Sequence, residues 1–68
     1  MTQVLEAVRL YSVASAAQLL EVSADYVYDR INAGELAVTE LGHGRAKQRI
    51  RADVLQTFID TRTSGAQL

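Results

Sequence analysis

The chain has 68 residues, the size of one small domain, and it contains no cysteine, which excludes disulfide bonds. A single histidine without cysteine excludes the usual ligand sets of a structural zinc site, and we expect no cofactor. The net charge of −1 at pH 7 argues, taken as a total, against nucleic-acid binding.

Residues 1–9 are predicted to be an N-terminal extension, for which a short helix after Thr2 and a frayed end fit equally well. Val4, Leu5 and Val8 would lie on one side of that helix. We expect these side chains to pack on the domain rather than to join a second copy of the chain.

Two helices with a very short link are predicted after a brief extended segment. Ser12 is the expected N-cap of a helix that ends near Glu21, and Ser23 is the expected N-cap of a helix over 24–33. Gly34 supplies the left-handed residue after the second helix. A link of two or three residues is typical of a helix-turn-helix. The apolar residues at helical spacing, expected in the core, are Val13, Ala16, Ala17, Leu20, Ala24, Val27 and Ile31.

A β-hairpin and a last helix are predicted next. Residues 37–41 are rich in strand-forming residues and would pair with 45–50 across the turn at 42–44. The last helix is expected over 52–61, with an apolar stripe of Val54, Leu55, Phe58 and Ile59.

The fold class predicted from this order is mainly α with a small β-hairpin, a winged helix-turn-helix with three to four helices. The domain would span residues 10–62, and 63–68 would be a flexible tail. No apolar run has the length of a membrane span, and the N-terminus lacks the pattern of a signal peptide. We therefore expect a cytoplasmic protein without membrane partners.

Basic residues are concentrated in one segment. Residues 1–41 hold two arginines against six acidic residues, 42–52 hold four basic residues and no acid, and 53–68 have a net charge of −1. Because strand side chains alternate between faces, four cations at alternate positions would line one face of the second hairpin strand. Binding to phosphates would neutralise them, whereas the alternative is a charged strand that prevents edge aggregation. These residues are Arg45, Lys47, Arg49 and Arg51.

The second predicted helix is expected to read bases, because this helix of a helix-turn-helix lies in the major groove. Arg30 would donate to guanine and Asn32 to adenine, while Asp25 or Asp29 would accept from cytosine. The alternative is an ordinary surface helix with two half-buried tyrosines. The candidate residues are Ser23, Asp25, Tyr26, Tyr28, Asp29, Arg30 and Asn32.

The turn Gly42-His43-Gly44 would form the tip of the wing. Glycine permits close approach to the sugar-phosphate backbone, so His43, Gly44 and Arg45 are candidate minor-groove contacts. A plain hairpin turn is an equally good interpretation.

We do not expect an enzyme or a small-molecule substrate. The chain has no glycine-rich phosphate loop, and its acidic residues show no pairing that suggests a general acid and base. Its three tyrosines lack the acid, base and anion-stabilising groups that a nucleophile needs.

Over about residues 10–60, the ordered features resemble excisionase-type and MerR-like winged-helix domains. In these domains a first helix contains two adjacent alanines and a leucine, and a Val-Ser pair leads into the recognition helix. A glycine follows the recognition helix, and a basic wing comes after it. The residues that match this pattern are Ala16-Ala17, Leu20, Val22-Ser23, Val27-Tyr28, Ile31, Gly34-Glu35-Leu36, Leu41-Gly42, Arg45, Arg49-Ile50 and Asp53.

The resemblance implies a phage excisionase, or recombination directionality factor, and with its size and composition the chain is most similar to the actinobacteriophage type. Such a protein binds attachment-site DNA cooperatively with other copies, bends it, and directs a tyrosine-family integrase toward excision. The chain departs from the family at Asp25 and Asp29, where members often have arginine or lysine. The alternatives are a small MerR-like transcription regulator, which usually continues after the wing, and an integrase adaptor that does not bind DNA.

Overall fold

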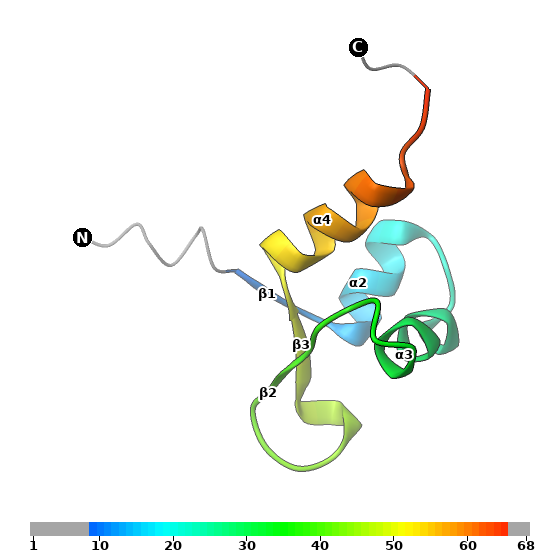
Figure 1. The fold of residues 1–68 in the computed structure, drawn as a ribbon. Coiled ribbons are helices and arrows are strands. Elements are labelled where there is room, and N and C mark those ends of the chain that lie inside the picture. The colour runs from blue at the N-terminus through cyan, green and yellow to red at the C-terminus, as the bar shows by residue number, and fades with distance from the viewer. Residues whose placement is uncertain (1–8, 66–68) are drawn as a thin grey trace, which may run out of the picture.

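The computed structural model describes residues 9–65. Eight residues of the predicted N-terminal extension and the last three of the predicted tail therefore lie outside the described residues. The described part contains three helices and a small sheet, which confirms the predicted fold class (Figure 1). The elements are β1 (Leu10–Ser12), α2 (Val13–Leu20), α3 (Ala24–Asn32), β2 (Thr39–Glu40), β3 (Gln48–Arg51) and α4 (Ala52–Arg62).

The link between α2 and α3 is as short as predicted. The Oγ atom of Ser12 accepts a hydrogen bond from the N–H of Ser15 at 3.0 Å, and the Oγ atom of Ser23 accepts one from Tyr26 at 3.2 Å. Both predicted N-caps are therefore confirmed. The reversal between the helices occurs at Glu21, whose φ of 59° places a non-glycine residue in the left-handed region.

The bounds predicted for the hairpin strands are wrong, and the sheet contains a third strand that was not predicted. The central strand is β3, which pairs antiparallel with β1 on one side and with β2 on the other. Residues 45–47 form a 3-10 turn instead of strand, because Gly44 has a φ of 86° and its carbonyl accepts from the Lys47 N–H at 3.1 Å. The segment before α2 was predicted only as extended chain, yet it is the third strand.

The core lies where α2, α3 and α4 meet β3. Its buried side chains are Val13, Ala16, Ala17, Val27, Leu36, Ile50, Leu55 and Phe58. Among the described residues, Ala24 and Ile59 depart from prediction because both are exposed. The core contacts of α3 begin only at Val27, one turn after Ala24. No helix within residues 9–65 is both long and apolar enough to cross a bilayer.

Candidate nucleic-acid interface

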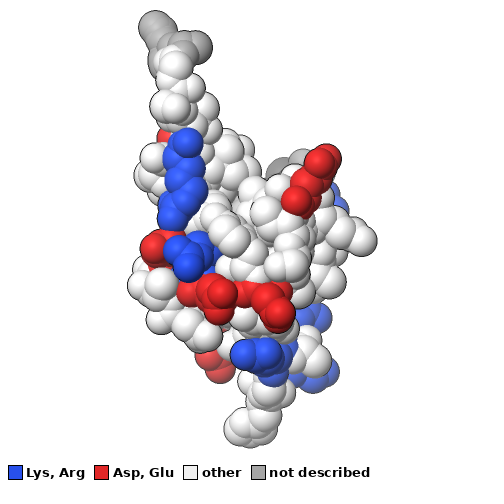
Figure 2. All heavy atoms as spheres, turned by 90° about the vertical axis from the view of Figure 1, so that its right-hand side faces the viewer, with Lys and Arg blue, Asp and Glu red and all other residues white. Residues whose placement is uncertain are grey.

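The outward face of α3 is exposed and acidic. Val27 is fully buried, while Asp25, Asp29 and Asn32 are exposed, which agrees with the predicted orientation of the helix. Figure 2 looks toward the side of the molecule on which α3 lies, and it shows acidic side chains in the middle of this face. Basic side chains lie above and below them in the same view. The exposed face of α3 is therefore acidic, and the nearest basic residues lie beside it.

A cation–π contact joins the wing to α3. The guanidinium carbon of Arg45 is 4.1 Å from the centre of the Tyr28 ring, a distance typical of a cation–π interaction. Tyr28 is half-buried and also packs against the core. This stack holds the first basic residue of the wing against α3.

The four basic residues of the wing do not share one strand, which corrects the sequence interpretation. Arg45 and Lys47 lie in the 3-10 turn, and only Arg49 and Arg51 lie in β3, on either side of the buried Ile50. The predicted alternation therefore holds for the last two residues alone.

Backbone and side-chain contacts already position the two strand arginines. The Nη1 group of Arg49 donates to the carbonyl oxygens of Ala46 and Gln48, both at 2.9 Å. The Nη2 group of Arg51 donates to the Oδ2 atom of Asp53, also at 2.9 Å. Because Asp53 already pairs with Arg51, Arg51 is the weaker candidate for binding phosphate. Arg49 has no carboxylate partner among these contacts, so its positive charge is not offset.

The tip of the wing is an exposed loop. Residues 41–47 are all exposed, including His43 and Gly44. The loop closes where the Leu41 N–H donates to the Lys47 carbonyl at 2.9 Å. The Lys47 stem lies over Gly42, where an added Cβ atom would be 3.2 Å from Lys47 Cγ. Glycine at this position therefore lets the lysine stem fold across the loop.

This arrangement of two capped helices, a short link and a wing has a counterpart among known protein families. A sequence profile of the helix-turn-helix domain family matches residues 10–63. The chain belongs to the helix-turn-helix domain family. Domains of this kind typically bind double-stranded DNA with their second helix in the major groove. No curated protein and no solved structure is significantly similar to the chain.

Sequence reasoning missed the partners of Arg30 in this helix-turn-helix domain. The Nη1 group of Arg30 donates to Glu35 Oε1 at 3.1 Å, and its guanidinium carbon is 5.4 Å from the Tyr26 ring centre. Arg62, at the end of α4, donates to the same Glu35 oxygen. Arg30 would have to leave this ion pair to donate to guanine. Residues 35 and 62 are too distant in sequence for any spacing rule to join them.

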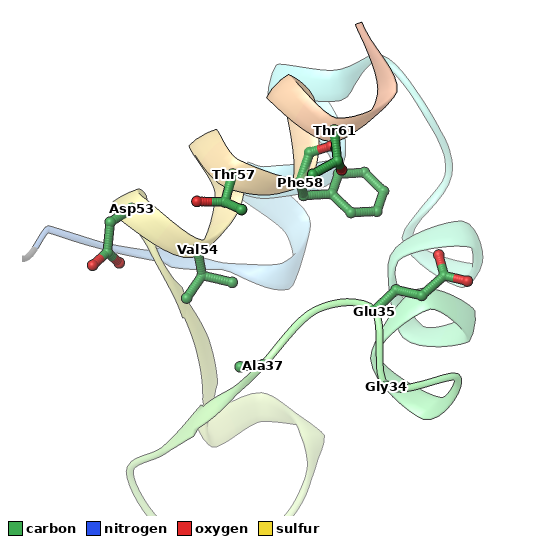
Figure 3. A pocket seen from close by; sticks show the side chains of 8 residues that line it. All are labelled: Gly34, Glu35, Ala37, Asp53, Val54, Thr57, Phe58 and Thr61. Atoms are coloured by element: carbon green, nitrogen blue, oxygen red, sulfur yellow. The ribbon is translucent and has the colours of Figure 1, made fainter.

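A cavity of about 410 Å³ lies between the exit of α3 and α4 of the helix-turn-helix domain (Figure 3). Of its two carboxylates, Glu35 pairs with Arg30 and Arg62, and Asp53 pairs with Arg51. Within residues 9–65, no three His, Cys, Asp or Glu side chains gather as metal ligands. The lining residues are Gly34, Glu35, Ala37, Asp53, Val54, Thr57, Phe58 and Thr61.

Proposed function

We propose that this helix-turn-helix domain is an excisionase-type protein, which binds attachment-site DNA and directs a tyrosine-family integrase toward excision. The observation that supports DNA binding best is the Tyr28–Arg45 stack, because it joins an exposed second helix to a basic wing. The helix would enter the major groove, while the wing would contact the neighbouring backbone or minor groove. Bond chemistry would belong to the integrase, so the domain itself would not be an enzyme.

Each group of residues has a distinct role in this proposal. Wing cations would neutralise phosphates and supply most of the affinity, which makes binding strongly dependent on salt. On the helix, Asn32 would donate to adenine, Asp25 or Asp29 would accept from cytosine, and Arg30 would donate to guanine once released from Glu35. Residues assigned to backbone or minor-groove contacts are Ser23, Tyr26, Tyr28, His43, Gly44, Arg45, Lys47, Arg49 and Arg51.

The acidic face of α3 favours a cooperative mode of action. Two carboxylates near a phosphate lattice weaken the binding of a single copy, since like charges repel. Several copies bound side by side would overcome this weakness, and the energy of their contacts would offset the cost of bending DNA, of order a few kcal/mol. We propose that a phage of the actinobacteriophage type encodes the protein. It would act on DNA in the cytoplasm of the bacterial host.

A salt titration tests DNA binding. Fluorescence anisotropy would measure affinity for a duplex selected from a random library, at several salt concentrations. The triple variant Arg45→Ala, Lys47→Ala, Arg49→Ala should reduce the slope of log K against log salt by about 0.9 for each lost phosphate contact. Arg9→Ala, which removes an exposed arginine just before β1, is the control. An unchanged slope in the triple variant would refute the wing assignment.

Excisionase function needs a separate experiment. Gel shifts on attachment-site DNA with phased-bend probes should show several cooperative complexes, bending, and a further shift when integrase is added. A single unbent complex that ignores integrase would instead favour a small transcription regulator. A shift that needs integrase and persists in the triple wing variant would favour an adaptor.

A further inference from the structure

Glu35 joins two arginines that come from different helices. Arg30, in the last turn of α3, donates to Glu35 Oε1 at 3.1 Å, and Arg62, in the last turn of α4, donates to the same oxygen. Two guanidinium groups therefore share one carboxylate, and the group of three keeps a net charge of +1. A site with this balance still attracts an anion.

Both guanidinium groups are supported by aromatic rings. The guanidinium carbon of Arg62 is 4.1 Å from the centre of the Phe58 ring, and that of Arg30 is 5.4 Å from Tyr26. Stacking of this kind reduces the side-chain freedom that each arginine loses when it binds a ligand. The two groups are thus held close together before any ligand arrives.

The group is open to solvent and has unused donors. The side chains of Arg30, Glu35 and Arg62 are 29%, 36% and 43% exposed. Each guanidinium has five N–H donors, and the contacts with Glu35 use only some of them, whereas the Nε atom of Arg30, which has no acceptor among the described residues, is buried. An incoming phosphate oxygen could therefore replace the carboxylate oxygen and keep the same two donors occupied.

The arginine pair and the wing lie on opposite flanks of α3. Tyr26 and Arg30 are four residues apart and share one side of the helix, whereas Tyr28, which contacts the wing, lies about 200° around the axis from Tyr26. The acidic residues Asp25 and Asp29 project between these flanks. Figure 2 agrees, because basic side chains lie on both the α4 side and the wing side of the acidic ones.

We propose that Arg30 and Arg62 form a second phosphate-binding site, which the Glu35 carboxylate fills in the free protein and a DNA backbone phosphate fills in the complex. A phosphodiester offers oxygen acceptors and one negative charge, as the carboxylate does, and arginine binds both well. With the wing on one strand and this pair on the other, the acidic α3 would be held across the major groove. This inference rests on the proposed DNA binding, and it assigns Arg30 to a backbone phosphate in place of the guanine contact named above.

Single substitutions at Arg62 and Glu35 test the site. Arg62→Gln should weaken binding to the selected duplex roughly three- to tenfold and reduce the salt slope by about 0.9. Arg62→Lys should retain most of the slope because it retains the charge. Glu35→Gln should strengthen binding by roughly threefold or more, because the phosphate no longer displaces an internal anion. Arg9→Gln is the control, since Arg9 also stacks on a ring, that of Tyr11, at 4.9 Å.

The outcomes separate this site from DNA binding itself. Circular dichroism would show whether each variant is folded under the titration conditions. Loss of an exposed ion pair should hardly lower the stability of the fold. If the triple wing variant lowers the slope while Arg62→Gln leaves affinity and slope unchanged, the pair is only a tie between α3 and α4 and the inference is wrong. If the unchanged protein binds no duplex at low salt, the proposed function fails as well.

Discussion

Tyr28 makes the one ring contact between α3 and the wing in the described part of the chain. Its ring lies under the Arg45 guanidinium, whose carbon is 4.1 Å from the ring centre. A cation–π contact of this kind contributes about 0.5–2 kcal/mol, depending on how far it is desolvated. The ring therefore fixes where the wing stands relative to α3.

The first prediction concerns this ring. Tyr28→Ala should weaken DNA binding about three- to tenfold, because Arg45 loses its position and must be ordered on binding. Tyr28→Phe keeps the ring and should bind almost as the unchanged protein does. Anisotropy titrations give both affinities, and thermal unfolding shows whether the half-buried site still folds. Equal losses in both variants would mean that the hydroxyl matters and the stack does not.

The second prediction compares the two exposed aspartates of α3. Asp29→Asn should raise affinity for unselected duplex roughly fivefold, since it removes a like charge worth about 1 kcal/mol beside phosphates. Asp25→Asn should do the same but also lower the thermal midpoint, because Asp25 lies in the first turn, where the helix dipole favours an anion. Affinity that falls in both variants would show that the carboxylates accept from bases.

At the scale of the helix, end residues decide where each element begins. Ser12 and Ser23 could be assigned from sequence because an N-cap depends only on a side chain and an N–H three residues later. Gly34, with a φ of 80°, ends the α3 segment for an equally local reason. The 3-10 turn at Arg45–Lys47 escaped prediction, because alternating basic residues suit a strand as well as a turn.

The third prediction is that Ser12→Ala lowers the free energy of unfolding by about 1 kcal/mol, through loss of the α2 cap. In a domain of this size, that change corresponds to roughly 4–8 °C in the thermal midpoint. Calorimetry or circular dichroism measures it. Ser15→Ala is the matched control, because Ser15 is exposed and contributes its backbone N–H to the cap rather than its hydroxyl. A midpoint shift of the same size in both would exclude capping as the cause.

At the scale of the whole molecule, β3 holds the helix-turn-helix and the wing together. It lies between β1, which leads into α2, and β2, which follows α3, and it continues directly into α4. Ile50 in this strand is 0% exposed, and Tyr11 stands opposite it in β1. The orientation of the wing is therefore coupled to the packing of the core.

The fourth prediction follows from that coupling. Ile50→Val should cost about 0.5–1.5 kcal/mol of unfolding free energy, and Ile50→Ala about 2–5 kcal/mol. Because small domains have little stability to lose, Ile50→Ala should be largely unfolded and unable to bind DNA at 25 °C. Chemical denaturation followed by circular dichroism gives both values. Ile50→Ala with the denaturation midpoint of the unchanged protein would contradict the central position of β3.

The sequence alone determined the two capped helices, the glycine exit of α3, the apolar stripes of α2 and α4, and the basic segment of the wing. These features depend on residues within about four positions of one another, so spacing and residue type suffice to predict them. Only the tertiary structure decided the strand order β1-β3-β2, the stack of Arg45 on Tyr28, and the convergence of Arg30 and Arg62 on Glu35. The strand order depends on pairing Leu10 with Arg51, the stack joins residues 28 and 45, and Arg62 is 27 positions from Glu35. Contacts between residues so far apart in sequence form only when the whole chain folds around its core, so spacing along the sequence cannot predict them.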